Sequence, residues 1–147
     1  MTTTAPAALN PSIIGQVEKH HTAILNRVLA GTALDEKRWI TLNQAVVPGA
    51  PAERADYVAH IAGMTQWDPA AVEAALVALA GAGLVSELPD DRIEVTEAGR
   101  VLVAKVRAES GAIVSRAYGV VPAEELALAA RVLTTITARL SEELAHA

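Results

Sequence analysis

The sequence predicts a mainly α-helical fold, and three observations support this prediction. Of the 147 residues, 52% are hydrophobic, and most of these are Ala, Val, Leu and Ile, with no Phe. Ala and Leu favour helices, and apolar residues recur at three- and four-residue steps in several segments. Only residues 84–95 alternate as half-buried strands do. A chain of this length can form one domain with its own core.

Two helices are expected in the first third of the chain. Residues 12–30 carry one apolar stripe, which Asn10 or Ser12 can cap at its start and Gly31 can end. A second helix is expected after Asp35, which is a possible N-cap. The apolar side of this second helix consists of Trp39, Ile40, Leu42, Ala45 and Val46.

Two further helices are expected after a turn. Two prolines and a glycine in residues 47–51 cannot continue a helix. A short helix then covers residues 52–64, and another begins at Asp68 and Pro69 and ends near Gly81. The packing face of this last helix is expected to contain Ala71, Val72, Ala75, Leu76 and Leu79, with Ala70, Glu73, Ala74 and Val77 nearer the outside.

The remaining elements are a hairpin and two long helices. A strand begins at Leu84, "PDD" forms a turn, and "RIEV" returns as a second strand. Thr96 is placed to cap a helix that runs to about residue 118. The last helix has Pro122 at a first-turn position, and Glu124 and Glu125 face its positive end.

This order of elements predicts a winged helix-turn-helix, in which two short helices precede a two-stranded wing. The winged region is expected over residues 35–99, after a flexible N-terminal arm over 1–11. Residues 12–34 and 100–147 form a helical dimerisation region. Their apolar stripes exceed what a small core can bury, so we expect a homodimer.

The composition excludes several other classes of protein. The chain has no apolar run long enough for a membrane span and no signal peptide, which predicts a cytoplasmic protein without a membrane partner. It has no Cys, which excludes disulfides and thiolate metal sites. It also lacks a Gly-x-Ser-x-Gly motif and a glycine-rich loop after a strand, so we expect no cofactor and no dedicated catalytic site.

The net charge of −5 is concentrated in the middle of the chain. Residues 48–99 contain two bases, Arg54 and Arg92, against nine acidic residues, which gives this segment a charge of −7. Proteins gain much of their affinity for DNA when Lys and Arg neutralise phosphates. Residues 48–99, which make up most of the winged region, are therefore a poor surface for phosphate binding.

Four stretches resemble the MarR family of bacterial transcriptional regulators over residues 12–145. "VEAALVALAGAGLV" is similar to the recognition helix and first wing strand. "VTEAGRVLVAKVR" and "VVPAEELALAARVLTTITARL" are similar to the wing exit and the two closing helices, and "DEKRWITLNQAVV" stands where the family has its second helix. The resemblance implies a homodimer whose winged lobes bind successive major grooves. It also implies a pocket between the dimer and winged regions, where a small aromatic ligand weakens DNA binding.

The resemblance also indicates candidate DNA contacts. The family's wing carries an Asp-x-Arg whose Arg reaches the minor groove, and Asp90-Asp91-Arg92 preserves this triplet on a shortened wing. The recognition helix itself lacks Lys and Arg, so only Thr65 and Gln66, just before it, can bond base edges or phosphates. The DNA-binding candidates are Arg54, Thr65, Gln66, Ala70 and Arg92.

Candidate ligand-binding residues lie in the first two helices. Two histidines on the first apolar stripe can hydrogen-bond a phenol or a carboxylate, and a Trp beside an Arg in the second helix can stack on an aromatic ring. The alternatives are that one His packs at a dimer interface while the other faces solvent, and that the Trp is a core residue. The ligand-binding candidates are His20, His21, Ile24, Arg38 and Trp39.

Other interpretations stay open for metal binding and for function. Glu18 with His21, and Asp56 with His60, have chelating spacings, but nothing in the sequence brings the two pairs together, so no metal site is predicted. The protein is either a ligand-responsive regulator or a relative that has lost DNA binding and acts as a ligand-binding protein or a repurposed-pocket enzyme. A third possibility is a protein-interaction module that uses residues 69–82.

Overall fold

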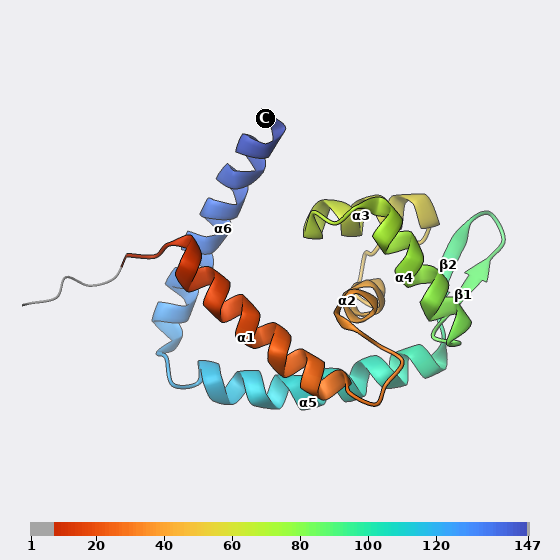
Figure 1. Ribbon diagram of the computed structural model, residues 1–147, viewed down its shortest axis with the longest axis horizontal. Coiled ribbons are helices and arrows are strands. Elements are labelled where there is room, and N and C mark those ends of the chain that lie inside the picture. Colours follow the sequence, from red (N-terminus) through yellow and green to blue (C-terminus); the bar gives the residue numbers. More distant parts are fainter. Residues whose placement is uncertain (1–7, 147) are drawn as a thin grey trace, which may run out of the picture. The chain divides into compact units, whose positions relative to one another are not determined.

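The computed structural model describes residues 8–146 and confirms a mainly helical chain with one two-stranded wing (Figure 1). The chain divides after Ser110 into two compact units. Of the predicted arm, residues 1–7 lie outside the described residues. The elements are α1 (Pro11–Leu29), α2 (Glu36–Ala45), α3 (Arg54–Thr65), α4 (Pro69–Gly81), β1 (Val85–Leu88), β2 (Arg92–Val95), α5 (Glu97–Tyr118) and α6 (Ala123–Ala145).

Four of these helices begin at a side-chain cap that the sequence indicated. Each cap oxygen accepts a hydrogen bond from a backbone N–H of the first turn, which would otherwise have no partner. The capping residues are Asn10, Asp35, Asp68 and Thr96, with N···O distances of 3.0, 2.8, 2.8 and 3.1 Å. The prediction for Pro122 was one residue off, since this proline is the N-cap itself and α6 begins at Ala123.

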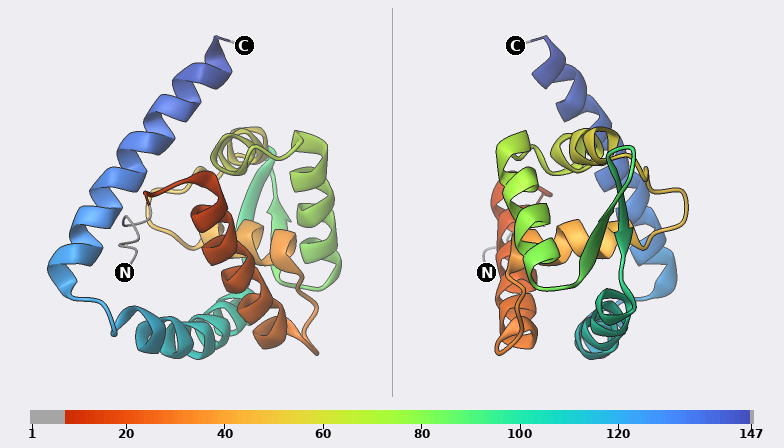
Figure 2. Two further views of the ribbon diagram at one scale, coloured as in Figure 1. Left: turned by 60° about the vertical axis from the view of Figure 1, so that its left-hand side comes forward. Right: turned by 90° about the vertical axis from the view of Figure 1, so that its right-hand side faces the viewer.

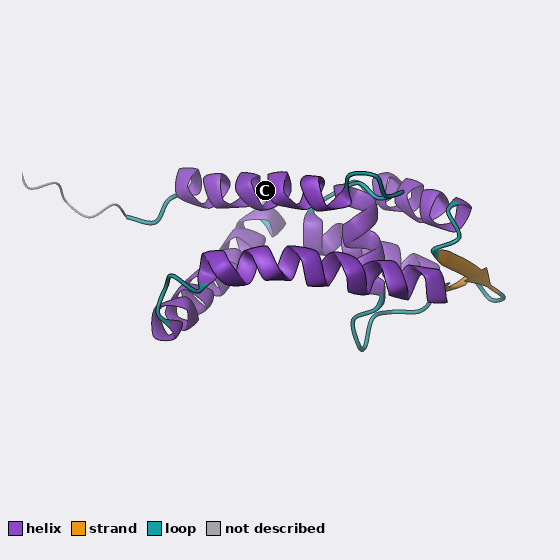
Figure 3. Ribbon diagram, turned by 90° about the horizontal axis from the view of Figure 1, so that it is seen from below, coloured by secondary structure: helices purple, strands orange, loops and turns teal. Residues whose placement is uncertain are grey.

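The wing is a short antiparallel hairpin in which Val85 pairs with Val95 and Leu88 pairs with Arg92 (Figure 3). Asp90 and Asp91 form its turn with φ values of 66° and 55°. Asp tolerates this left-handed region better than most residues, because its short polar side chain can bond locally. The wing therefore consists of two four-residue strands joined by a tight turn.

A third extended segment pairs with the hairpin, which the sequence did not indicate. Ile93 N donates to Ala52 O at 2.8 Å, and Arg54 N donates to Asp91 O at 2.7 Å. Glu53 forms an isolated antiparallel bridge with Arg92. The helix expected over residues 52–64 therefore begins two residues late, because the backbone of its first residues completes the edge of the wing.

The core of the first unit forms where α2 and α3 pack on α4 and β2 packs on α2 (Figure 1). Four residues of the predicted packing face of α4, Val72, Ala75, Leu76 and Leu79, are buried, whereas the fifth, Ala71, is half-buried. Trp67 packs against this core from the turn before α4, and Lys37 Nζ lies 5.5 Å from the centre of its ring. This cation–π contact ties α2 to the helix-turn-helix turn.

Gly99 allows α5 to approach the start of the wing. A Cβ at this position would lie 2.3 Å from Leu84 O and 2.7 Å from Val95 Cγ1, which is closer than real Cβ atoms come. Thr96 Oγ1 closes the same junction, because it donates to Gly83 O at 2.7 Å. The first turn of α5 is therefore fixed against the wing by backbone contact.

We expect Gly99→Ala to lower the free energy of unfolding by about 1–3 kcal/mol, because the added methyl group meets backbone that cannot move aside. Urea denaturation at fixed protein concentration measures this change. Gly63→Ala is the matched control, since nothing lies within 4 Å of a Cβ on that glycine of α3. The control is expected to stabilise the protein by up to about 1 kcal/mol. Equal effects of the two substitutions would contradict the close approach at Gly99.

Tyr57 is fully buried, and its hydroxyl donates to the backbone carbonyl of Thr41 in α2. Burial raises the pKa of this phenol above its ordinary value. The folded protein therefore holds Tyr57 neutral at a pH where the unfolded chain ionises it. The stability that this provides is fully present below the unfolded pKa of about 10 and is lost as the pH rises further.

We expect Tyr57→Phe to remove part of the alkaline loss of stability. The variant loses one hydrogen bond, so its free energy of unfolding at neutral pH is lower by about 1 kcal/mol. Between about pH 9 and pH 11, however, its denaturation midpoint falls less than that of the wild type. If the denaturation midpoints of the variant and the wild type fell equally as the pH rises, the result would contradict a buried, neutral Tyr57 phenol.

Candidate nucleic-acid interface

The outer face of α4 presents small apolar side chains to solvent. Ala70, Ala74 and Val77 are exposed, and Val77 is 61% accessible. The only charged side chain within α4 is Glu73, which is half-buried. This helix occupies the recognition position after the helix-turn-helix turn, yet its exposed face offers methyl groups rather than hydrogen-bond donors.

Arg54 does not face solvent as a free cation, because two carboxylates bind it. Its Nε and Nη2 donate to Glu73 Oε2 at 2.9 and 2.7 Å, and its Nη1 donates to Glu87 Oε1 at 2.7 Å. The arginine side chain is only 20% accessible. The hydrogen bond to Glu73, together with the charges of both carboxylates, raises the pKa of Arg54.

This cluster, which we call the Arg54 node, joins three elements of the winged region. Arg54 begins α3, Glu73 lies in α4, and Glu87 lies in β1, the strand that packs beside α4 (Figure 2). The sequence analysis missed both acidic partners. They lie 19 and 33 residues from Arg54, so no local spacing could have indicated them.

Thr65 and Gln66, the two predicted polar contacts before α4, are both bonded within their own turn. Thr65 Oγ1 donates to Ile61 O at 2.7 Å and accepts from Trp67 N at 3.2 Å. Gln66 has a left-handed φ of 61°, and its Nε2 donates to Gly63 O at 2.7 Å. In this arrangement the two side chains complete the end of α3.

Arg92 is the base of the wing that keeps its charge available. Ion pairs of arginine among residues 8–146 involve only Arg38, Arg54 and Arg139. Arg92 is exposed at the start of β2. Of the five predicted DNA contacts, Arg92 and Ala70 are therefore the two whose side chains are exposed without a polar partner within the described chain.

The predicted ligand residues lie on α1 and α2, with different degrees of exposure. His20 is exposed, and its Nδ1 lies 2.6 Å from Gln16 O, whereas His21 and Ile24 are half-buried. Trp39 is buried in the core at 8% accessibility, which favours its interpretation as a packing residue.

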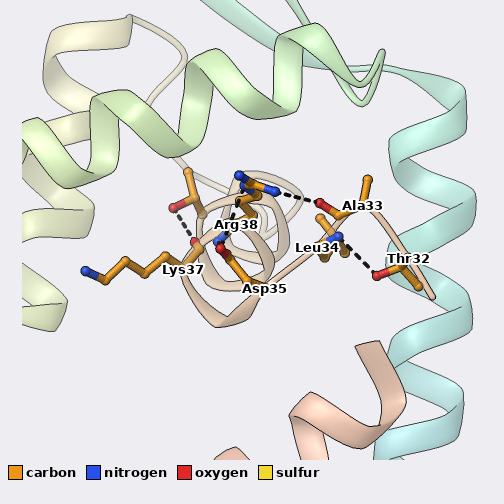
Figure 4. A network of polar contacts seen from close by, with 7 residues as sticks. Thr32, Ala33, Leu34, Asp35, Lys37 and Arg38 are labelled. Carbon is orange, nitrogen blue, oxygen red and sulfur yellow. Dashed lines mark hydrogen bonds and ion pairs between the residues drawn. The ribbon is translucent and has the colours of Figure 1, made fainter. Parts of the chain in front are cut away.

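Arg38 is held at the start of α2 by the segment before it. Its Nη1 donates to Ala33 O at 3.2 Å, and its Nε lies 3.8 Å from Asp35 Oδ2 (Figure 4). These partners are weak, because the arginine side chain is 42% accessible and the contacts are long. Its guanidinium group is therefore only weakly paired.

The two chelating pairs are not assembled into a metal centre within the described chain. Across residues 8–146, no three His, Asp or Glu side chains lie close enough together to hold an ion. Glu18 Oε1 accepts from Thr22 Oγ1 at 3.0 Å. The neighbouring Asp56 carboxyl raises the pKa of the exposed Glu53.

The length and apolarity of the helices also show whether any of them could span a membrane. No helix formed by residues 8–146 has an uninterrupted apolar stretch sufficient to cross a bilayer.

Comparison with known proteins shows which fold this geometry represents. Neither a protein-family model nor a curated protein sequence matches the chain. Solved structures do match it: CouR from Rhodococcus jostii RHA1, bound to p-coumaroyl-CoA, aligns with a TM-score of 0.71 and 22% identity over 84% of this chain and 88% of CouR.

Two further structures align to a similar degree. A MarR-family protein of Mycobacterium tuberculosis in complex with p-aminosalicylic acid has a TM-score of 0.67 and 18% identity, over 88% of this chain and 99% of that one. BpsR of Bordetella bronchiseptica, whose DNA binding is regulated by 6-hydroxynicotinic acid, has a TM-score of 0.67 and 19% identity, over 90% and 98%. The class is therefore that of winged helix-turn-helix proteins. Within it, the chain has the fold of the MarR-family transcriptional regulators.

We expect the Arg54 node to contribute to stability as a coupled unit. Arg54→Ala leaves two carboxylates without their partner and should lower the free energy of unfolding by about 1–2 kcal/mol. Combined with Glu73→Gln, the loss should be smaller than the sum of the two single losses, as a double-mutant cycle in urea would show. Arg27→Ala, which removes an exposed arginine, should change stability by less than about 0.5 kcal/mol. Strict additivity would contradict the coupling.

Proposed function

We propose that the protein is a ligand-responsive transcriptional regulator of the MarR type that binds DNA as a homodimer. The observation that carries this proposal is the winged unit itself. Its recognition helix α4 has an exposed outer face, and its wing carries the exposed base Arg92. Both are features that a winged helix-turn-helix uses to contact the major groove and the neighbouring backbone or minor groove.

Residues 111–146 support the homodimer. None of them is buried within their own unit, although α6 is amphipathic and bears many large apolar side chains. Many large apolar side chains left exposed on one helix indicate an interface in soluble proteins. The most exposed of these side chains in α6 are Leu128, Val132, Leu133, Leu140 and Leu144.

The proposed DNA contact uses little charge. Ala70, Ala74 and Val77 can contact the C5-methyl groups of thymine in the major groove, which is the apolar form of base readout. Arg92 supplies one cation per protomer for a phosphate or a narrow minor groove. The salt dependence of binding should therefore be shallow, because few counterions are released.

An aromatic acid is the proposed class of effector. The p-coumaroyl-CoA and p-aminosalicylic acid bound by two of the similar proteins, and the 6-hydroxynicotinic acid that regulates the third, all contain an aromatic ring and a carboxyl or acyl group. In this chain, His20, His21 and Ile24 on α1 and Arg38 on α2 supply hydrogen-bonding, apolar and cationic contacts for such a ligand. Trp39 has an indirect role in this proposal, because it belongs to the buried core that holds α2 in place.

A second candidate is a ligand-binding protein that has kept the fold and lost DNA binding. The Arg54 node favours it, because pairing of Arg54 leaves Arg92 as the one base without an ion pair in residues 48–99, against nine acidic residues. The two candidates differ in a single measurable property, which is the affinity for operator DNA.

Binding of the purified protein to its own upstream DNA, measured at several salt concentrations, tests the proposal. A regulator should bind with nanomolar affinity and a small negative slope of log K against log salt. Arg92→Ala should weaken binding and bring the slope closer to zero by about one per protomer. Arg27→Ala, the charge-matched control on α1, should change neither. Absence of binding even at low salt would favour the second candidate.

A further inference from the structure

A cavity of about 340 Å³ lies at the root of the wing, within the first unit. Its walls come from the end of α2, the loop that leads to α3, both strands of the hairpin and the first turn of α5. The volume falls within the range of about 300–1,000 Å³ that is typical of small-molecule sites. This cavity is separate from the proposed effector residues, none of which lines it.

Small side chains leave this space open. Ala45, Ala50 and Ala52 line one part of the cavity, where larger residues would fill it. The hairpin contributes apolar residues from one of its faces, namely Val85, Ile93 and Val95. The cavity therefore offers an apolar wall against which a hydrocarbon or an aromatic ring can pack.

The charged groups of the cavity favour a monoanion. Arg92 and Arg100 both line it, as does the single carboxylate of Glu94. Neither arginine has an ion pair within residues 8–146. The two arginines and the glutamate together carry a net charge of +1. One ligand carboxylate would neutralise this charge, and a second would make the site negative. Arg100 was not among the residues that the sequence indicated, since it lies in α5 beyond the predicted wing.

We propose that this cavity binds a small monocarboxylate with an apolar body of about ring size. The carboxylate accepts hydrogen bonds from Arg100 and Arg92, whose planar guanidinium groups suit two-oxygen acceptors. The apolar body packs against the alanines and the hairpin side chains.

Occupancy of this site has a consequence for DNA, and this part rests on the proposed function. Arg92 belongs to both the cavity and the proposed DNA contact, so a bound carboxylate neutralises the base that the wing offers to DNA. Ligand and DNA then compete directly for one guanidinium. This competition needs no rearrangement of the helices.

Titration of the full-length protein with benzoate, followed by calorimetry and by amide chemical shifts, tests the site without DNA. We expect saturable binding with shifts at the hairpin and the first turn of α5, and binding of neutral benzamide that is at least about tenfold weaker. Arg100→Ala should weaken benzoate binding about tenfold or more, whereas Lys105→Ala, on the same helix, should leave it unchanged. Ala52→Leu, which narrows the cavity at an exposed position and keeps its charge, should also reduce benzoate affinity.

Three outcomes would overturn the proposal. They are no saturable binding of benzoate, equal affinity for benzoate and benzamide, or benzoate shifts confined to residues outside the cavity. If Arg100→Ala weakens DNA binding while benzoate does not bind, Arg100 is a phosphate contact and the ligand site is wrong. If benzoate binds at the hairpin but no DNA is bound under any condition, the site stands and the proposed regulatory function fails instead.

Discussion

The geometry of the winged region depends on one guanidinium group. Arg54 lies at the point where the chain leaves the edge of the wing and enters α3, and its side chain binds a carboxylate on α4 and another on β1. Its backbone N–H donates to Asp91 in the wing turn. Side chain and backbone together thus fix the wing against the recognition helix. The buried hairpin residues Val85, Ile93 and Val95 add to this, because they pack in the same core as α4.

The Arg54 node also determines which charged groups of the winged region remain available to bind a partner. It neutralises Glu73, the acidic residue that would otherwise repel phosphates from the recognition helix. In doing so it uses one of the two bases of the segment, so the positive charge of the wing is reduced to Arg92. A surface of this kind favours recognition through methyl contacts and groove shape over phosphate neutralisation.

Local features were predictable from the sequence, and distant pairings were not. The caps at Asn10, Asp35, Asp68 and Thr96 and the packing face of α4 depend on residues within one or two turns, so spacing alone indicated them. The Arg54 node and the bond from Ile93 to Ala52 join residues far apart in the chain, and no alternation or spacing encodes such pairs. For the same reason, the sequence analysis interpreted Arg54 as a DNA contact. It also overlooked Arg100 at the root of the wing.

The role of Arg54 can be observed directly by NMR of its guanidinium group. If the Arg54 node holds the wing, the Nε–H signal of Arg54 exchanges slowly with water, sharpens relative to that of the exposed Arg27, and is lost in Glu73→Gln. The signal also keeps its position when DNA is added, while that of Arg92 moves. Rapid exchange of the Arg54 signal in the free protein, or a shift on addition of DNA as large as that of Arg92, would contradict a structural role for Arg54.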